Sequence, residues 1–420
     1  MFIIALVLGG FVLYRYRRLN TPLPQSQTIA PKSTDGMIAT ALQQLEKHPD
    51  DIRIPISLSQ LYLQKVRETA DAAYYKKIDE LMSAAEKIDP RNSDIASVRA
   101  LNAMGRHDFA GGLIFAKKAL TARPDSATYW GIVGDAEIEL GQYQEAAVSF
   151  QRMIDLKPNF SSWSRVAYIR ELNGDIAGAK DALNSAITAG SYFPENTAWG
   201  FVELGKLAAR DSIDDGEQYF NRALKILPNY PPALEGLAGV AFAKGDYTQA
   251  RRYLETAFDH LPIAQYAIKL GDIAAKEGDT AKANQQYTLA RIAFDKSLSS
   301  GVNTDMEMAL FLADHDMDLP LALAKAEAAY KVRPSILGAD TLAWALYKNQ
   351  KYTEAARLSH EALRLGWYDP IILFHAAMIA EKNNNRAESL RLIKKSLALN
   401  PHFSFQYVDV AHEIVKKLER

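Results

Sequence analysis

Apolar side chains recur along this chain with a helical period, in pairs of short stretches, and the pair between residues 127 and 160 is the most complete. Trp130 and Val133 share one face of the first stretch, Gly141 interrupts the pattern, and the second stretch stops at Pro158. This spacing predicts a helix, a tight turn and an antiparallel helix. The apolar face of the second helix is expected to consist of Tyr143, Ala146, Phe150 and Met153.

The sizes of the residues in this unit indicate how its two helices pack. Gly134 and Ala146 are small, so the helices can approach closely, whereas Phe150 presents a bulky side chain to a neighbouring unit. Pro158 has no amide hydrogen with which to continue the helix and therefore ends it. Because one hairpin cannot bury both of its faces, the pattern predicts an array of stacked units.

Eight positions of the unit agree in order and spacing with the tetratricopeptide repeat (TPR), which the unit resembles. Glu137 stands where that repeat usually has an aromatic residue. The resemblance implies an all-α fold in which helical hairpins stack into a solenoid, a right-handed superhelix. The matching residues are Trp130, Val133, Gly134, Gly141, Tyr143, Ala146, Phe150 and Pro158.

Variants of this unit fill the chain over residues 36–403, and about ten of them can be counted. They predict a TPR solenoid over that range. A longer connection breaks the period after Ala189, and in a later unit the second helix is expected to run past Arg291 towards Leu298. Pro320 lies where a helix is expected to begin, a position that tolerates proline.

Residues 1–14 are apolar without interruption and are followed by Arg15, Arg17 and Arg18. As a short apolar helix they would rise about 21 Å, less than the ~30 Å hydrocarbon core of a bilayer. We interpret residues 1–18 as a membrane anchor whose arginines extend to the interface. A signal-like segment and a buried core helix are the alternatives. If residues 1–18 are a membrane anchor, the arginines favour a cytoplasmic location for the rest of the chain.

Two kinds of segment flank the repeats. Residues 19–35 carry Pro, Ser, Thr and Gln without periodicity, which predicts a flexible linker. A short amphipathic helix from Met37 to Lys47 and a second one within residues 404–420 are expected to cap the array, because an uncapped repeat exposes an apolar face. The C-terminal part also resembles bacterial TPR proteins of unassigned function.

Composition narrows the possible functions. The 49 Lys and Arg residues against 50 Asp and Glu give a net charge of −1, without the basic surplus of a nucleic-acid-binding protein. The chain has no cysteine, which excludes disulfides, thiolate metal sites and a cysteine nucleophile. Because of the balanced charge, we expect no nucleic-acid partner.

Motifs for catalysis or metal binding are incomplete. Asp314, Asp316 and Asp318 alternate as in a calcium loop, but Leu319 stands where that loop requires glycine. Two His-Glu pairs begin like a zinc-protease helix and lack its second histidine. Neither a phosphate-binding loop nor a nucleophile elbow occurs. Since the repeats leave no segment of catalytic size, we predict a protein that is not an enzyme and has no cofactor, metal or small-molecule substrate.

In TPR arrays the first helix of each hairpin lines a concave groove, and the resemblance places several aromatic side chains there. Large rigid side chains provide contact area at low entropic cost, so such a groove suits a peptide or helix of a protein partner. The alternative is that each ring only packs against the adjacent repeat. The predicted partner-binding residues are Tyr168, Trp199, Phe242, Phe311, Trp344, Tyr347, Phe374 and Met378, with polar neighbours such as Asp135, Lys206, Asp272 and Asp340.

One ligand class can be argued against. TPR domains that bind the C-terminal tails of heat-shock chaperones carry Lys and Asn at two groove places of the first helix, and one unit here has Glu235 and Gly239 at those places. We hypothesise a scaffold or assembly factor, tethered to a membrane, that recruits protein partners into a complex. The alternative is an exported periplasmic factor for the maturation of an envelope enzyme or complex.

Overall fold

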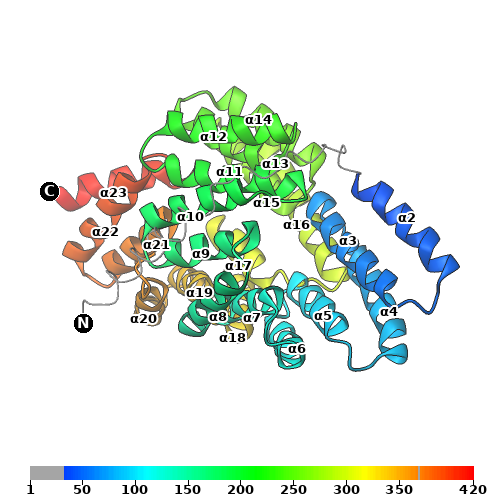
Figure 1. Ribbon diagram of the computed structural model, residues 1–420. Coiled ribbons are helices and arrows are strands. Elements are labelled where there is room, and N and C mark those ends of the chain that lie inside the picture. Colours follow the sequence, from blue (N-terminus) through cyan, green and yellow to red (C-terminus); the bar gives the residue numbers. More distant parts are fainter. Residues whose placement is uncertain (1–32, 368) are drawn as a thin grey trace, which may run out of the picture. The chain divides into compact units, whose positions relative to one another are not determined.

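The computed structural model describes residues 33–367 and 369–420, and all regular structure among them is α-helical (Figure 1). The chain divides into two units, residues 1–33 and 34–420, and the second contains all the helices of the described part. The predicted anchor helix within residues 1–18 lies outside the described residues. No helix of the described part combines the length and the apolar character needed to cross a bilayer.

Within residues 34–420 the helices pair into ten antiparallel hairpins between two single helices, so the predicted all-α solenoid is confirmed. The single helices are α2 (Thr34–Lys47) and α23 (Val408–Glu419). The hairpins are α3 (Arg53–Thr69) with α4 (Ala73–Ile88), α5 (Ser93–Gly105) with α6 (Phe109–Ala122), α7 (Ala127–Glu139) with α8 (Tyr143–Leu156), α9 (Phe160–Leu172) with α10 (Ile176–Ala189), α11 (Pro194–Ala208) with α12 (Ile213–Ile226), α13 (Pro231–Ala243) with α14 (Tyr247–His260), α15 (Ala264–Lys276) with α16 (Thr280–Ser299), α17 (Asp305–Asp314) with α18 (Leu319–Val332), α19 (Ile336–Lys348) with α20 (Tyr352–Ala362), and α21 (Pro370–Lys382) with α22 (Arg386–Leu399).

Several turns inside the hairpins use the same local chemistry. After α13, Gly245 has a φ of +78°, which glycine adopts without steric cost. The following residue, Asp246, caps α14, because its carboxylate accepts a hydrogen bond of 2.9 Å from the amide of Gln249. Equivalent aspartate caps begin α6, α10 and α16 at Asp108, Asp175 and Asp279. In the turn after α13 the glycine therefore allows one helix to end, and the aspartate cap starts the next within a few residues.

Small residues allow the two helices of a hairpin to pack closely, as the sequence predicts. A Cβ atom added to Gly134 in α7 would fall on the ring of Phe150 in α8. The same relation joins Gly205 to Phe220 and Gly271 to Tyr287. The alternation of small and aromatic side chains therefore fixes the spacing within these hairpins.

Two expected departures from the regular repeat are also confirmed. Helix α16 continues past Arg291 to Ser299, so it has 20 residues. Pro320 lies in the first turn of α18, where its missing amide hydrogen breaks no helical hydrogen bond.

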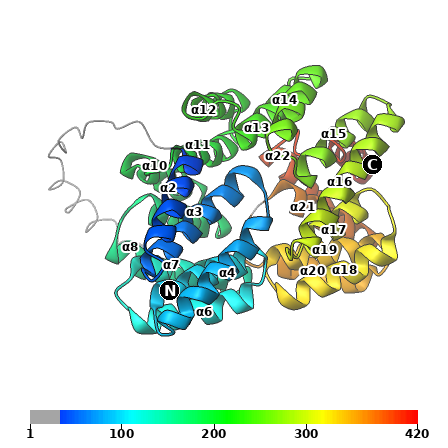
Figure 2. The ribbon, with the colours of Figure 1, turned by 90° about the vertical axis from the view of Figure 1, so that its right-hand side faces the viewer.

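The superhelix returns onto itself, so that hairpins far apart in sequence meet along what we call the seam. At the seam the turns at residues 106–109 and 139–143 contact residues 303–307 and 333–336. The amide of Ile336 donates to the hydroxyl of Tyr143 at 2.8 Å, across 193 residues of sequence. In Figure 2, α4 and α6 lie in the lower left of the view and α17, α18 and α20 lie to their right.

Further seam contacts are polar and lie on either side of this bond. The amide of Asn303 donates to the carbonyl of Arg106 at 3.1 Å, and the Asn303 carbonyl accepts a 2.6 Å hydrogen bond from Nδ1 of His107. Arg333 pairs with Glu139 at 2.5 Å.

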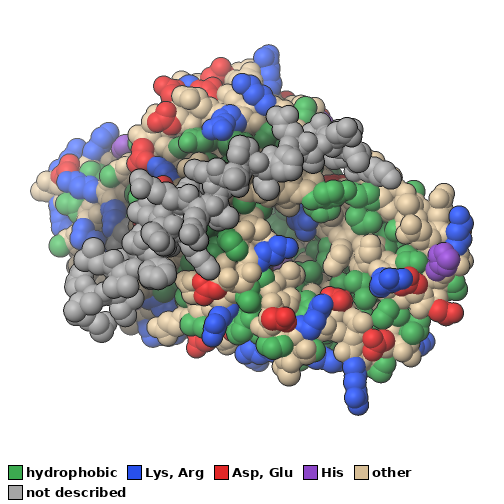
Figure 3. Space-filling view, viewed as in Figure 1, with side chains coloured by type: hydrophobic (Ala, Val, Ile, Leu, Met, Phe, Trp, Pro, Cys, Tyr) green, Lys and Arg blue, Asp and Glu red, His purple; other side chains and the backbone are tan. Residues whose placement is uncertain are grey.

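On the outer surface visible in Figure 3, acidic and basic side chains are intermixed and no single charge dominates.

The segment before α23, residues 403–407, crosses the concave side of the superhelix, and we call it the strap. Phe405 packs edge-on against Phe242 of α13, with ring centroids 4.4 Å apart. Tyr407 stacks on Phe374 of α21 at 4.8 Å, and its hydroxyl lies 2.9 Å from Oδ1 of Asp314. The predicted C-terminal cap thus has a second role, because the residues before its helix join α13 to α17 and α21.

Candidate functional site

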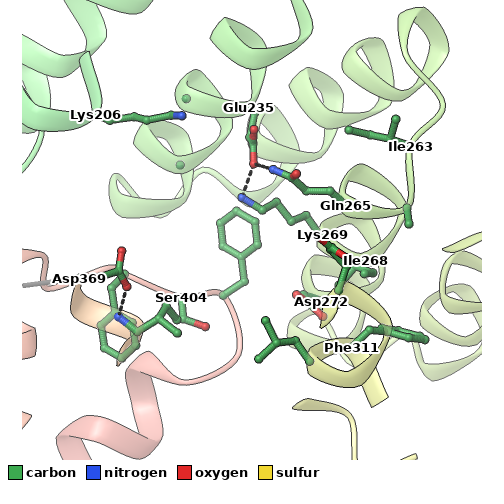
Figure 4. A pocket seen from close by; sticks show the side chains of 18 of the residues that line it. Lys206, Glu235, Ile263, Gln265, Ile268, Lys269, Asp272, Phe311, Asp369 and Ser404 are labelled. Carbon is green, nitrogen blue, oxygen red and sulfur yellow. Dashed lines mark hydrogen bonds and ion pairs between the residues drawn. The ribbon is translucent and has the colours of Figure 1, made fainter. Parts of the chain in front are cut away.

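The concave side of the superhelix forms an open cavity of about 990 Å³ (Figure 4). Helices α9, α11, α13, α15 and α17, each the first helix of its hairpin, supply much of the wall, and the strap contributes the part around Ser404. Apolar side chains such as Ile268 and Phe311 alternate with charged ones. Among the lining residues, seven are Asp or Glu and four are Lys or Arg, so carboxylates are in excess.

A charged cluster projects into the cavity from three neighbouring first helices. Oε1 of Glu235 in α13 accepts hydrogen bonds from Lys269 and Gln265 of α15, both at 2.5 Å (Figure 4). Opposite them, Lys206 of α11 donates to Glu203 at 2.8 Å. Each of these side chains occupies the inward face of its helix, so the repeat geometry brings together residues more than 60 positions apart.

The charge state of this cluster follows from its partners. Burial alone would raise the pKa of Glu235, but the ion pair with Lys269 and the nearby charge of Lys206 lower that pKa below its usual value. Burial disfavours the charged form of Lys206, yet the carboxylates of Glu203, Glu235 and Glu171 raise its pKa. Both groups are therefore ionised at neutral pH, and the surroundings of Lys206 are dominated by carboxylates.

Two histidines near the cavity are paired with carboxylates. His315 lies at the end of α17, with Nε2 2.8 Å from Oδ1 of Asp272 and Nδ1 2.8 Å from the carbonyl of Phe311. Burial opposes protonation, but the hydrogen bond and charge of Asp272 raise the pKa of His315. With acceptors at both nitrogens, the ring is arranged to donate from each as an imidazolium.

His375 in α21 is a second such residue, and it is almost fully buried. Its Nδ1 lies 3.0 Å from Oδ2 of Asp340, and its ring stacks on Trp344 with centroids 4.1 Å apart. Burial opposes protonation, whereas Asp340, Asp314 and Asp369 raise the pKa of His375. Asp314 itself accepts hydrogen bonds from Trp344 Nε1 and Tyr407, and burial raises the pKa of this carboxyl group.

The acidic and basic side chains at the cavity lie close together, but they are paired with one another. The carboxylates of Glu235, Asp272 and Asp340 each face a cationic or imidazole partner at hydrogen-bond distance. Among the residues that the structure describes, no three His, Cys, Asp or Glu side chains are grouped so that they could hold a metal ion. The arrangement can bind a charged or polar segment through the inward faces of α11, α13 and α15.

The structure distributes the eight predicted partner-binding residues between the cavity wall and the core. Tyr168, 37% exposed, and Phe311, 2% exposed, line the cavity. Trp199 packs on Phe160, Phe242 lies under Phe405, and Tyr347 stacks on Trp344. Trp344 and Phe374 are 2% and 1% exposed, and Met378 packs against the same apolar cluster. Partner binding by these residues stays a prediction.

Several residues that line the cavity are not among the predicted partner-binding residues. Gln265 and Lys269 form part of the charged cluster, and Gly239 opens the wall beside them. Their place in the repeat is a signal that could have identified this part of the wall, because Glu235, Gly239 and Asp272 occupy groove places of their units. No sequence pattern marks Phe405, which reaches the cavity from the strap.

Comparisons with known proteins agree with this architecture. The sequence model of the family described as Tetratricopeptide repeat matches residues 98–159 and 236–297. The anaphase-promoting complex subunit CDC16 of Saccharomyces cerevisiae is 28% identical over 137 residues, which cover 32% of this chain and 16% of that protein. The TPR repeat-containing protein MJ1428 of Methanocaldococcus jannaschii is 23% identical over 235 residues, covering 51% of this chain and 41% of that protein.

An alignment with one solved structure extends along most of the chain. The crystal structure of yeast Tom70 matches with 16% identity and a TM-score of 0.38, covering 98% of this chain and 94% of that chain. The chain spans less than half the length of either sequence relative.

Proposed function

Because this chain is a tetratricopeptide repeat protein, we propose that it is a non-catalytic scaffold that binds a segment of a protein partner in its inner cavity. The observation that carries the proposal is the cavity itself, whose wall consists largely of first helices of successive hairpins. A protein-protein interaction role fits this architecture, since an extended concave surface can contact a partner through several repeats. The mutual pairing of the cavity's acids and bases favours recognition over catalysis.

Recovery of partners tests this function. The tagged full chain would be cross-linked in native membranes, purified and compared by quantitative mass spectrometry with a variant that carries Tyr168→Ala and Lys206→Ala. Both side chains reach the cavity and are partly exposed, so their loss leaves the core intact. We expect this variant to recover much less of a specific partner, because it lacks contacts at the binding surface.

Tyr192→Ala is the matched control, since Tyr192 is 69% exposed and is not among the cavity-lining residues. Equal recovery by the cavity variant and this control would refute the cavity as the binding site. Trp344→Ala is unsuitable, because this buried ring holds Asp314 and His375 in place and its loss would perturb the fold.

We also propose that residues 1–18 tether the scaffold to a membrane and that the repeats lie on the cytoplasmic side. The support is the uninterrupted apolar run of residues 1–14 and the arginines that follow it. A reporter that is active only outside the cytoplasm, fused to the C-terminus, should be inactive. Reporter activity would instead favour the exported accessory factor. That alternative is supported if the same apolar run is a signal-like segment.

A further inference from the structure

One helix presents only glycine and alanine to part of the cavity wall. Gly236, Gly239 and Ala243 follow one another along the inward face of α13. Gly236 has a packing reason, because a Cβ atom there would fall on the ring of Phe220. Gly239 has none of this kind, since a Cβ atom added to it would meet no atom of the described residues within 4 Å.

Glycine at an open position inside a helix carries a cost without a packing reason. Glycine is less favourable than alanine in a helix interior, and no positive φ requires it here. What the glycine does in this structure is keep the cavity wide and the backbone of α13 accessible at this point. A chain segment could approach α13 more closely here than at a residue with a side chain.

Charges surround this bare surface. Glu235 lies one turn before Gly239, on the same face of α13, and binds Lys269 and Gln265 from the neighbouring hairpin. On the other side stands Lys206, whose own partner is Glu203. Two further carboxylates that line the cavity, Asp314 and Asp369, accept hydrogen bonds from uncharged donors, and among the described residues no Lys or Arg forms an ion pair with either.

Resting on the proposed scaffold function, we infer that the surface around Gly239 receives an extended, lysine- or arginine-rich segment of a protein partner. Its backbone lies along the bare face of α13, and its basic side chains reach the carboxylates that exceed the bases in the cavity wall. Charge complementarity of this kind selects partners and sets their register. The strap forms a wall of the same cavity, with Ser404 and Phe405 among its lining residues.

A peptide selection tests the inference without knowledge of the natural partner. The full chain in detergent would be immobilised and used to select binders from a displayed library of random peptides. We expect the enriched peptides to contain more Lys and Arg than Asp and Glu, and their binding to weaken as salt is raised. Synthetic versions labelled with a fluorophore would then be titrated against variants.

Gly239→Leu and Gly239→Ala form the matched pair. Leucine would fill the opening, whereas the methyl group of alanine leaves most of it free, and neither meets an existing atom near Cβ. We expect the leucine variant to bind the selected peptides at least about tenfold more weakly than the alanine variant. Circular dichroism and thermal unfolding of both variants would show that the fold is kept.

Three outcomes would overturn the inference: enriched peptides that are neutral or acidic, equal binding by both glycine variants, or a selection that enriches nothing. None of these would by itself refute the scaffold function, which the recovery of partners by the cavity variant tests separately. A native partner could be lost from the Tyr168→Ala and Lys206→Ala variant and still bind both glycine variants equally. In that case the cavity would remain the binding site, and the bare face of α13 would not be part of it.

Discussion

The backbone amide of Ile336 donates a hydrogen bond to the hydroxyl of Tyr143, 2.8 Å away, and this bond joins two hairpins separated by 193 residues. Both ends are buried, since Ile336 is 1% and Tyr143 8% exposed. A side chain from one repeat thus completes the first turn of a helix in a distant repeat. The seam is therefore a specific interface inside the chain.

Replacing the Tyr143 hydroxyl should destabilise the protein. Tyr143→Phe would leave the buried amide of Ile336 without an acceptor, at a cost of about 1–3 kcal/mol in the free energy of unfolding. Denaturant titration followed by circular dichroism measures this change. Tyr192→Phe, on an exposed side chain, should alter the value by less than about 0.5 kcal/mol. Equal effects of the two substitutions would contradict the assigned role of the bond.

Arg333 should hold the seam closed. Its guanidinium group pairs with Glu139 at 2.5 Å, lies 3.7 Å from Glu307 and covers the ring of Phe109 at 5.0 Å. In Arg333→Ala we expect faster amide hydrogen exchange at residues 139–143 and 303–307, with little change in hairpins remote from the seam. Arg152→Ala, on the outer face of α8, is the control. Unchanged exchange at the seam would show that this contact does not hold it.

Stability should fall as pH rises above neutrality. The pKa of His375 is raised by Asp340, Asp314 and Asp369, and that of unfolded histidine is about 6.5. The stabilisation from its charged form is complete below the unfolded pKa and is lost as pH rises through the higher folded pKa. The raised pKa of Asp314 has the same sign, but its effect begins at the unfolded aspartate pKa of about 3.9 and therefore in a more acidic range.

Denaturation midpoints between pH 6 and pH 9, a range set by the unfolded histidine pKa of about 6.5, would measure this dependence. His375→Gln should flatten the decline, because the glutamine does not titrate. His48→Gln, at an exposed position, should leave the decline unchanged. A wild-type midpoint that stays constant or increases over this range would refute the expectation.

Two glycines should respond to alanine in opposite ways. Gly134→Ala would push a methyl group into the ring of Phe150, and the strain should exceed the gain in helix propensity, for a net loss of about 1 kcal/mol or more. Gly239→Ala meets open space and should gain up to about 1 kcal/mol from helix propensity. Thermal or denaturant unfolding of the two variants compares them directly. A loss of stability in Gly239→Ala would show that the cavity wall leaves no room for a methyl group at this position.

The sequence determined the hairpins because their signals are local. Gly134, Phe150 and Pro158 lie within one repeat, and their spacing predicts helix, turn and helix without knowledge of the rest of the chain. The same local logic predicted the long α16 and the place of Pro320. Each confirmed feature depends on residues a few positions apart.

The seam and the paired histidines could not be predicted in this way. Contact between Tyr143 and Ile336 depends on small rotations accumulated over several repeats, which no residue pattern encodes. His375 carries no motif, and its partner Asp340 lies one repeat earlier, so neither suggests the other in the sequence. Burial of Trp344 and Phe374 likewise follows from the strap, whose path across the interior leaves no periodic signal.

The seam also imposes an order on assembly. Neighbouring hairpins can form from any starting point, because each requires only the next one. The bond between Tyr143 and Ile336 can close only after the five hairpins between α8 and α19 are in place. Its closure is consequently a late step in folding, and a nascent chain that has not yet completed α19 must remain open at the position where the finished protein is joined.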